Sequence, residues 1–592
     1  MTMASRRTSK PPTGRQSLYE PLDWVLVRAP LLPVEAYLAL DNPSAPEETN
    51  GRQNSEPAPV DRLPADPRIR AALAVGSGNL FEVLGRTHPS GRDDPESDGK
   101  LLRYLIRMST RPTPYGLFAG VALARWGPET DLALASTQPR TRTRPDMAWL
   151  LRLVMEAESR TDVRKELSYV ANPRAFMHAG RLFLPEPAPT RDGNGPAPAV
   201  SARATNVVRR ALALARTPIP YERLVAELTT VTGATIDKVE KLIEDLWRQT
   251  FLLTDLRPPL TDLAPASYVA RRLHDVPAAA DLRGRLETAL SGMAEWDSLP
   301  IEKAADAYRK LTIPSDSNDP AASEPCSQVD MALALNGSRI NQAVAQEAIR
   351  TAELLLRLSP LPFGLPYLDA YRRSFEVRYG TEREVPLLEL LDPNVGLGPP
   401  SSFYGAPSGG DPRKAALRQQ TLYDLAITAL RERQLVVELD EEKLARLESW
   451  TPTARGAPQS LDVSLFVVAS SAMDVDEGRF QVVVGPNLGA SAAGRNLGRF
   501  ADLIGDEATA ALQAVGRAEV SQNPNCIWAE LVYLPWRFRS ANVAVRPHPR
   551  PLRLLSRPPL DGHLSASFPS TSWWLESKTI GSTYDGRSGT RM

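Results

Sequence analysis

The sequence is poor in the residues that most often carry metal or nucleophilic chemistry. Its 592 residues include two cysteines, Cys326 and Cys526, which lie far apart, and five scattered histidines. This scarcity excludes a disulfide framework and predicts a reducing compartment, by default the cytoplasm. Because there is no HExxH motif and no i, i+4 histidine pair, we expect neither a metal ion nor a bound cofactor. Without a GxSxG elbow or Cys–His pair, nothing requires a protein nucleophile.

Long apolar runs and an excess of one charge are also missing. The longest apolar stretches, such as QLVVEL and SLFVVASSAM, are far too short to span a membrane, and the N-terminus lacks the apolar segment of a secretory signal. Lys plus Arg and Asp plus Glu both number 70, so the molecule as a whole attracts neither a polyanion nor a membrane. Any contact with nucleic acid must therefore come from local basic patches.

Stretches rich in Pro and Gly divide the chain into several units, as its length predicts. Residues 1–17 are polar and are predicted to be disordered, so we expect the fold to begin at residue 18. Helical and strand patterns follow in mixed order, without regular βαβ repeats, which predicts an α+β fold of several subdomains. Residues 549–592 are rich in Ser, Pro, Arg and Gly without periodicity, which predicts a disordered tail.

Three short helical segments lie between residues 200 and 260 and are followed by TFLLTDLRPPL. Three helices and a β ribbon predict an inserted winged helix-turn-helix. The third helix carries Asp237, Glu240, Glu244 and Asp245, and such an acidic helix is poorly suited to DNA phosphates. The pattern therefore favours a peptide-binding element over a DNA reader.

The first candidate site is a pair of cations at a helix end. Arg107 and Arg111 lie four residues apart and therefore on one helix face, and the prolines that follow stop that helix. Thr113 lies in the extended exit. Guanidinium groups match carboxylates and phosphates, so this cluster suits an anionic substrate. The other interpretation is a solvated or salt-bridged helix end.

Two further candidates are a glycine-rich turn and a pair of isolated aspartates. The segment GPNLGASAAGRNLGRF at 485–500 leaves a strand and presents backbone amides followed by Arg495 and Arg499. It either cradles an anion or forms a structural turn. Asp146 and Asp330 each lie at the entrance of a strand or helix, where capping of a helix N-terminus is the alternative role.

Five segments, in order, resemble the N-terminal, glutamylating region of class I lantibiotic dehydratases. The most specific is LLRYLIRMSTRPTPYGLFAGVALARW, and the others are WVLVRAP, LPFGLPYLDAYRRSFEVRYGTEREVPLLELLDPNVGLGPP, VVVGPNLGASAAGRNLGRFADLIG and AELVYLPWRFRSANVAVRP. The resemblance spans residues 18–548 and implies transfer of glutamate from glutamyl-tRNA, as co-substrate, to Ser or Thr side chains of a precursor peptide. It also implies that the winged helix holds the leader of that peptide.

The resemblance implies catalytic positions residue by residue. Arg107, Arg111 and Thr113 match the family's R-x-x-x-R-x-T run, and the remaining implied positions are Arg28, Asp146, Asp330 and Arg495. In the implied transesterification, arginines hold the glutamyl carboxylate and the terminal phosphates, and an aspartate grips the amino group or orients the acceptor hydroxyl. We expect tRNA contacts that are local and salt-sensitive, among them Arg103, Arg107, Arg140, Arg142 and Arg144.

Nothing in the sequence resembles the elimination domain that ends a full-length member of this family, and three functions stay open. The first is a split transferase that glutamylates the peptide and hands it to a separate elimination protein; here we expect a homodimer without DNA or membrane partners. The second is a related peptide aminoacyl-tRNA ligase that appends an amino acid to a carrier peptide. The third is a non-catalytic, leader-binding remnant.

Overall fold

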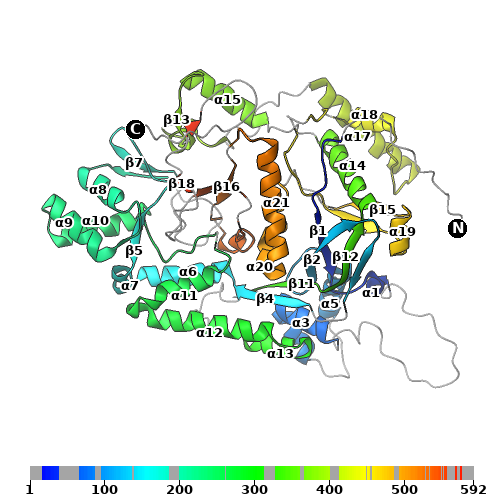
Figure 1. Cartoon of the computed structure of the whole chain (residues 1–592), viewed down its shortest axis with the longest axis horizontal. Coiled ribbons are helices and arrows are strands. Elements are labelled where there is room, and N and C mark those ends of the chain that lie inside the picture. Colours follow the sequence, from blue (N-terminus) through cyan, green and yellow to red (C-terminus); the bar gives the residue numbers. More distant parts are fainter. Residues whose placement is uncertain are drawn as a thin grey trace.

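The computed structural model of the chain is organised around a six-stranded sheet with helices on both faces (Figure 1). It describes residues 17–38, 66–86, 95–135, 139–185, 199–260, 262–311, 327–359, 366–400, 412–448, 450–453, 457–485, 492–526, 528–532, 534–535, 537–547, 550, 552–555, 567–569 and 574–575. Residues 1–16 of the N-terminal segment that was predicted to be disordered lie outside these ranges. Ser17 is described, and its hydroxyl donates to the Glu353 carboxylate at 2.8 Å.

The central sheet has the strand order β3-β12-β2-β11-β4, and β1 is added beside β2. Strand β11 runs antiparallel to β4 and parallel to β2, so segments distant in the sequence become neighbours. The six strands are β1 (Trp24–Pro30), β2 (Ala119–Gly127), β3 (Asp131–Leu134), β4 (Arg140–Pro145), β11 (Ser327–Ala332) and β12 (Leu335–Asn341).

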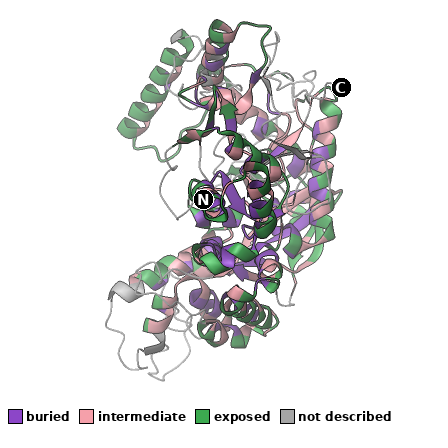
Figure 2. Ribbon diagram, turned by 90° about the vertical axis from the view of Figure 1, so that its left-hand side faces the viewer, coloured by how far each residue is buried: buried purple, intermediate pink, exposed green. Residues whose placement is uncertain are grey.

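The two faces of this sheet are covered by different helices, because successive side chains of a strand point to opposite sides. Val329 and Met331 of β11 belong to a core with α3 (Pro67–Gly76), α5 (Pro95–Thr110) and α13 (Ile301–Lys310). Leu123 of β2 packs against α20 (Ala501–Ile504) and α21 (Asp506–Gln522) on the other face. Figure 2 shows buried residues gathered in the interior of the molecule, with exposed residues on the outer helices. Asp330, between Val329 and Met331, therefore faces α20.

A second core lies within residues 168–254, on the left in Figure 1. Its strands form two three-stranded sheets, β10-β5-β9 and β6-β7-β8, and three helices pack with them. The unit begins earlier than the predicted 200–260, because Tyr169, Leu182 and Leu184 of the preceding strands belong to the same core. Its elements are β5 (Ser168–Ala171), β6 (Phe176–His178), β7 (Arg181–Leu184), β8 (Val200–Arg203), α8 (Asn206–Leu214), β9 (Ile219–Pro220), α9 (Tyr221–Thr232), α10 (Ile236–Arg248) and β10 (Leu252–Thr254).

Helix α6 (Met147–Ser159) links the central sheet to this second unit. It follows β4 directly, and Asp146 caps its N-terminus by accepting the Ala148 amide at 2.8 Å. At its other end Glu158 is 2% exposed; it accepts hydrogen bonds from the Thr254 hydroxyl at 2.5 Å and from the Arg257 guanidinium at 2.7 Å. The α6 helix thus ties β10 to β4.

The remaining elements surround these two cores. The mixture of helices and strands confirms the predicted α+β class. They are α1 (Val34–Leu38), α4 (Gly78–Arg86), α7 (Thr161–Glu166), α11 (Pro265–His274), η2 (Pro277–Ala279), α12 (Ala280–Asp297), α14 (Gln342–Leu358), α15 (Pro366–Tyr379), β13 (Val385–Pro386), α16 (Leu387–Leu391), α17 (Pro412–Glu432), α18 (Glu441–Leu447), β14 (Leu465–Val468), α19 (Ala472–Asp476), β15 (Gln481–Val484), η5 (Gly498–Phe500), β16 (Ala529–Val532), η6 (Phe538–Val543), β17 (Leu552–Leu555), β18 (Ser567–Pro569) and β19 (Trp574–Leu575).

The predicted disordered tail, 549–592, contains three of these strands. Strand β17 pairs in parallel with β16 and with β18, and β19 pairs with β13. Three of the four residues of Leu552–Leu555 are leucine, which the prediction from the overall composition of the tail overlooked, and this described stretch is a strand. Most of the tail lies outside the described residues.

Two absences hold for the ranges that the structure describes. No helix there combines the length and the apolar character needed to cross a lipid bilayer. In the same ranges, no three His, Cys, Asp or Glu side chains are grouped so that they could hold a metal ion.

We predict that Glu158→Ala lowers the free energy of unfolding by about 3–5 kcal/mol, because it leaves the buried Arg257 guanidinium without its carboxylate. Chemical denaturation followed by circular dichroism measures the loss. The matched control is Glu156→Ala on the same helix, where the carboxylate is exposed and a change within about 1 kcal/mol is expected. Equal effects of the two substitutions would contradict the structural role of Glu158.

Candidate functional site

The strand β4 (RTRTRP) alternates arginine and threonine, and the two sets point to opposite faces. Thr141 and Thr143 donate hydroxyl hydrogen bonds of 2.8 Å to Asp297 at the end of α12. The Thr143 amide also donates to this carboxylate, at 2.7 Å. The arginines of β4 consequently face α20 and the carboxylate of β11. One short strand therefore anchors a helix on one side and supplies cations to the other.

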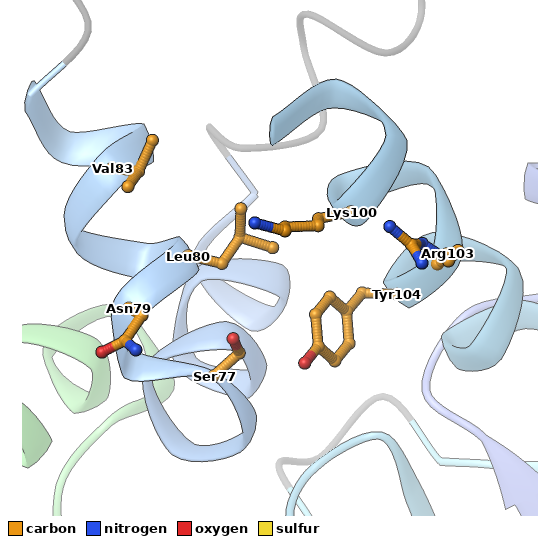
Figure 3. A pocket seen from close by; sticks show the side chains of 7 residues that line it. All are labelled: Ser77, Asn79, Leu80, Val83, Lys100, Arg103 and Tyr104. Carbon is orange, nitrogen blue, oxygen red and sulfur yellow. The ribbon is translucent and has the colours of Figure 1, made fainter. Parts of the chain in front are cut away.

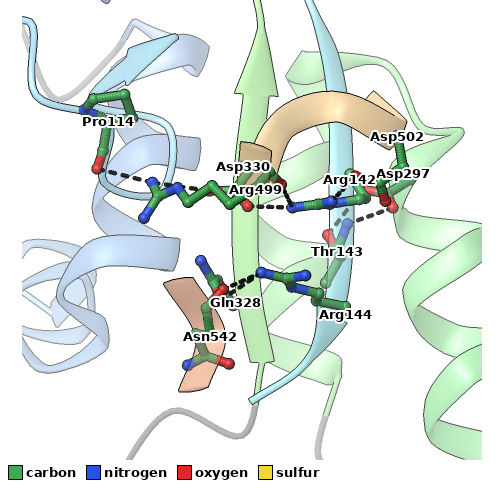
Figure 4. A network of polar contacts seen from close by, with 10 residues as sticks. All are labelled: Pro114, Arg142, Thr143, Arg144, Asp297, Gln328, Asp330, Arg499, Asp502 and Asn542. Carbon is green, nitrogen blue, oxygen red and sulfur yellow. Dashed lines mark hydrogen bonds and ion pairs between the residues drawn. The ribbon is translucent and has the colours of Figure 1, made fainter. Parts of the chain in front are cut away.

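Asp330 is the anionic centre of the network drawn in Figure 4. It is 2% exposed and lies in mid-strand, so it is not a helix cap. Arg142, its partner in the register of β4 and β11, forms an ion pair with it at 2.5 Å and contacts Asp502 of α20. Arg499 donates to the other carboxylate oxygen of Asp330 at 3.2 Å. Burial opposes the charge on Arg142, but Asp330 and Asp502 outweigh it and raise the Arg142 pKa.

Arg499 connects this network to the segment that follows α5. Its Nη2 donates to the Pro114 carbonyl at 3.4 Å, one residue after Thr113. Its guanidinium also lies 4.4 Å from the ring centroid of Phe500. Burial lowers the pKa of Arg499; Asp330 opposes that shift, whereas Arg142 adds to it. Asp330 therefore neutralises Arg499 only in part, because the same carboxylate also pairs with Arg142.

The predicted pair at the end of α5 lies beside this contact. Arg107 is half-buried, and its guanidinium lies 4.8 Å from the Tyr115 ring centroid. The Arg107 Nε is buried and has no hydrogen-bond partner. Arg111 and Thr113 are exposed. Neither arginine pairs with a carboxylate of the described residues. The end of α5 is therefore not salt-bridged through these two arginines.

Strand β1 adds Arg28 to the cluster from the other side of β2. Burial lowers the pKa of Arg28, the nearby Arg499 lowers it further, and Asp462 opposes both. Across the described part of the chain, the Arg28 guanidinium makes no hydrogen bond or ion pair. Asp462 is largely engaged elsewhere, because its carboxylate accepts the amides of Gly494 at 2.9 Å and Asn496 at 3.2 Å. Arg28 is thus a partly buried cation without an anion of its own.

The glycine-rich turn differs from the expectation of an amide cradle. Its amides at 493, 494 and 496 already donate to Ser460 and Asp462, so side-chain oxygens of the protein itself occupy them. Residues 486–491 of the turn lie outside the described residues. Arg495 is exposed and does not join the network, whereas Arg499, four residues later, does.

Asp146 lies at the far edge of the network. Besides capping α6, it accepts from the Asn542 side chain at 2.8 Å and pairs with Arg539 at 3.3 Å. Asn542 connects it to the arginines of β4, because the Asn542 carbonyl accepts a hydrogen bond from Arg144. The N-cap alternative therefore describes the contacts of Asp146, whereas its catalytic role stays a prediction.

The arginines of β4 differ in their access to a large ligand. Arg144 is 9% exposed, and burial together with Arg142 lowers its pKa to about 10. Arg142 and Arg144 are engaged inside the protein, which does not fit the expected contact of both with tRNA. Arg140 is exposed and remains available to a ligand at the surface.

The assembled site carries more cations than its carboxylates neutralise. Asp330 and Asp502 face Arg142, Asp330 is shared with Arg499, and backbone amides hold Asp462. Among the described residues, Arg28, Arg107 and Arg111 form no ion pair with a carboxylate. A carboxylate or phosphate bound here would gain charge-assisted hydrogen bonds. Sequence reasoning missed Asp502 and Asp462, and it expected Arg142 to contact tRNA and not Asp330. The alternating Arg and Thr of β4 was the available signal for the inward position of Arg142.

Comparisons with known proteins give one family. A family model for the N terminus of lantibiotic dehydratases matches residues 65–561. Subtilin biosynthesis protein SpaB of Bacillus subtilis is 24% identical, over 89% of this chain and 50% of that protein. The chain spans about half the length of the curated relatives it matches.

Solved structures show the same likeness. The tRNA dependent lantibiotic dehydratase MibB from Microbispora sp. 107891 matches with a TM-score of 0.75 and 27% identity, over 95% of this chain and 53% of that chain. The glutamylation domain of TbtB from thiomuracin biosynthesis matches with a TM-score of 0.54 and 17% identity, over 88% of this chain and 64% of that chain. At that identity, the second match shows similarity of fold.

We predict that Arg28→Met raises the free energy of unfolding by about 0.5–2 kcal/mol, because it removes a partly buried cation that Arg499 repels. Denaturant titrations without and with sulfate test this. Sulfate should stabilise the unchanged protein more than the variant, since a bound anion stabilises only the state that holds it. Arg223→Met, at an exposed position of α9, is the control. A destabilised Arg28→Met variant would contradict the unpaired-cation interpretation.

Proposed function

The chain belongs to the family of lantibiotic dehydratase N-terminal regions, and we propose that it transfers glutamate from glutamyl-tRNA to Ser or Thr of a ribosomally made precursor peptide. The observation that carries this proposal is the surplus of guanidinium groups beside the R-x-x-x-R-x-T run. It is further supported by the names of two similar structures, a tRNA dependent lantibiotic dehydratase and a glutamylation domain.

The proposed reaction is a transesterification. The acceptor hydroxyl oxygen attacks the ester carbonyl carbon of glutamyl-tRNA, the bond between that carbon and the ribose oxygen breaks, and the hydroxyl proton passes to the ribose oxygen. Positioning and charge stabilisation supply the rate enhancement, and no protein nucleophile is needed. The products are a glutamyl ester on the peptide and free tRNA.

The described residues suit distinct tasks in this step. Arg107, Arg111 and Arg28 offer guanidinium groups to the glutamyl carboxylate or a terminal phosphate, and Thr113 offers a hydroxyl at the same place. Arg499 contacts both Asp330 and the carbonyl next to Thr113, so it fixes the exit of α5 against the sheet. Asp330, with both oxygens engaged, acts by holding Arg142 and Arg499 in place. We propose no cofactor besides the tRNA.

The 168–254 unit suits recognition of the leader peptide. Three helices with the small sheet β6-β7-β8 are consistent with a winged-helix element, and such a sheet can accept an added peptide strand. On the β6 side, His178 lies 3.4 Å from Glu389 of α16. We therefore propose that the leader adds beside β8. A cytoplasmic location, a homodimer and a separate elimination protein stay predictions.

We predict that the purified chain, given its precursor, tRNA, glutamate and glutamyl-tRNA synthetase, adds glutamate-sized mass increments to Ser or Thr. Arg111→Ala and Arg499→Ala should each lower this addition by about 100-fold or more, because each removes a charge-assisted contact at the reacting groups or their support. Mass spectrometry of the peptide gives the measurement, with Arg223→Ala as the control. Comparing Arg495→Ala with Arg499→Ala in the same assay shows which arginine of the turn the glutamate transfer needs.

The same experiment separates the alternatives. Addition of one residue to the C-terminus of the peptide would establish the ligase, and leader binding without any mass change would establish the scaffold. Either result would overturn the proposed transfer to hydroxyl groups.

We predict that a synthetic leader peptide slows amide hydrogen exchange in β8 of the full chain, because strand addition gives the edge amides new acceptors. Exchange measured by mass spectrometry, with a scrambled leader as control, locates the effect. Slowing confined to residues outside 168–254 would contradict the assignment of this unit.

A further inference from the structure

Two features of the structure lie outside the transfer mechanism described above. The first is a pocket of about 440 Å³ between α4 and α5 (Figure 3). Of the two cations that line it, Lys100 is already engaged within the chain, and Arg103 donates its Nε to the Gly99 carbonyl at 3.1 Å. Little free positive charge therefore faces this pocket. The second feature is the two-stranded ribbon of β14 and β15, whose first strand lies within the apolar run SLFVVASSAM.

The ribbon exposes an apolar face. Strands β14 (Leu465–Val468) and β15 (Gln481–Val484) form an antiparallel pair, and no other strand of the described residues is added to it. Phe466, Val468 and Val483 project to one face of this pair and are between 39% and 52% exposed. A two-stranded ribbon on its own is marginally stable in water. An added strand would therefore stabilise it.

The outer edge of β14 presents backbone groups to such a strand. The Gly485 amide donates to the Ser464 carbonyl at 2.9 Å, so these two residues form a hydrogen-bonded pair of the ladder. Bonded and non-bonded pairs alternate along an antiparallel ladder. Leu465 and Val467 consequently direct their N–H and C=O groups away from β15. Strand β15 is the one beside α14 (Figure 1), which leaves β14 as the outer strand.

The ribbon runs beside the central sheet and ends at the candidate site. Helix α19 follows β14, and there Asp476 accepts the Thr130 amide at 2.8 Å, just beyond the end of β2. At the other end, Asp462 precedes β14 and interacts electrostatically with Arg28. Arg28 is paired near the start of β2. A strand added to β14 would therefore have one end close to the unpaired cation of the site.

The size and chemistry of this surface fit one extended peptide. Four strand residues span about 13 Å and neighbouring strands lie about 4.8 Å apart, so the ribbon is far smaller than the roughly 800 Å² that each partner buries in a stable dimer. Its exposed face carries no charge, which does not suit a polyanion. A peptide can use both the edge and the apolar face. Its end beside Arg28 lies where the proposed reaction needs a Ser or Thr hydroxyl.

We propose that the outer edge of β14 binds an extended segment of the acceptor peptide by strand addition, with uncharged apolar residues beside Phe466 and Val468. The ribbon thereby presents the neighbouring Ser or Thr to the arginines of the site. This inference rests on the proposed function, because it assigns a binding surface to the peptide substrate of that reaction. It is separate from the leader contact at β8.

The first test is peptide binding by the full chain, with a short acetylated peptide in which Thr alternates with Val as the probe. At a concentration about twice its Kd, the peptide should slow amide hydrogen exchange in β14 about threefold, because protection follows occupancy. Mass spectrometry of proteolytic fragments locates the effect. Unchanged exchange in β14 at saturating peptide would overturn the proposal.

Val467→Pro removes one outward N–H and keeps the bonds between β14 and β15, since proline is tolerated at the outer edge of a sheet. It should raise the KM for the precursor peptide about 5- to 10-fold with kcat nearly unchanged, as one lost edge hydrogen bond predicts. It should also remove the slowing of exchange in β14. Val436→Pro, at an exposed position outside any strand, is the matched control and should change neither. Circular dichroism verifies that both variants are folded.

A change of charge tests the side-chain contact. Val468→Asp should weaken binding of the Thr–Val peptide and strengthen binding of a peptide in which Thr alternates with Lys, each by about 2- to 5-fold, as for side chains opposite each other on neighbouring strands. Equal weakening of both peptides would show a merely structural effect and contradict the contact.

Other occupants of the ribbon give different results. If sedimentation velocity shows that the unchanged chain self-associates and that Val467→Pro abolishes this, the ribbon holds a second copy and the proposal is wrong. If the peptide protects β14 but no glutamate is transferred, the proposed function fails and the ribbon stands. If glutamate is transferred and Val467→Pro alters neither KM nor exchange, the ribbon assignment fails and the transferase stands.

Discussion

The structure depends on the ion pairs of one buried carboxylate, that of Asp330. Its two oxygens hold Arg142 and Arg499, which belong to segments far apart in the sequence. Because a lone buried charge is costly, removing any one of these three groups would leave the others less well compensated. The pairing fixes β4 against β11 and the η5 turn against the sheet, and through the Pro114 carbonyl it places the exit of α5. The remaining cations of the site are arranged around that fixed core.

The cationic surplus is compatible with a chain whose formal net charge is zero, because the compensating carboxylates lie elsewhere. On α10, for example, Asp237 and Asp245 are exposed and form no ion pair among the described residues, whereas Glu240 pairs with Lys165 at 2.9 Å and Glu244 with Arg164 at 2.7 Å. At the candidate site the reverse holds, and cations exceed anions. A small negatively charged group would therefore be attracted to a local field that the composition does not reveal.

How much could be predicted from the sequence depended on how far apart along the chain the interacting residues lie. Local patterns were sufficient for the α+β class, for α6 with Asp146 before it, and for Arg107 and Arg111 on one side of a helix end. The pairing of Asp330 with Arg142 depends on which strands become neighbours, and spacing along the chain carries no information on that. The choice between Arg495 and Arg499 likewise depends on where the turn meets the sheet. The N-terminal start of the 168–254 unit was missed because its first strands are short and are separated from its helices by a Pro-rich stretch.

Helix α6 also fixes the distance between two parts of the molecule. Its 13 residues span about 20 Å, from the buried contact of Glu158 with Thr254 of the 168–254 unit to the end of β4. Both ends are anchored by buried hydrogen bonds, so the separation is rigid. For a substrate gripped at one end and altered at the other, this leg alone equals about six residues of extended chain. In such a substrate, the distance between the bound part and the altered part would therefore be set by the protein's own secondary structure.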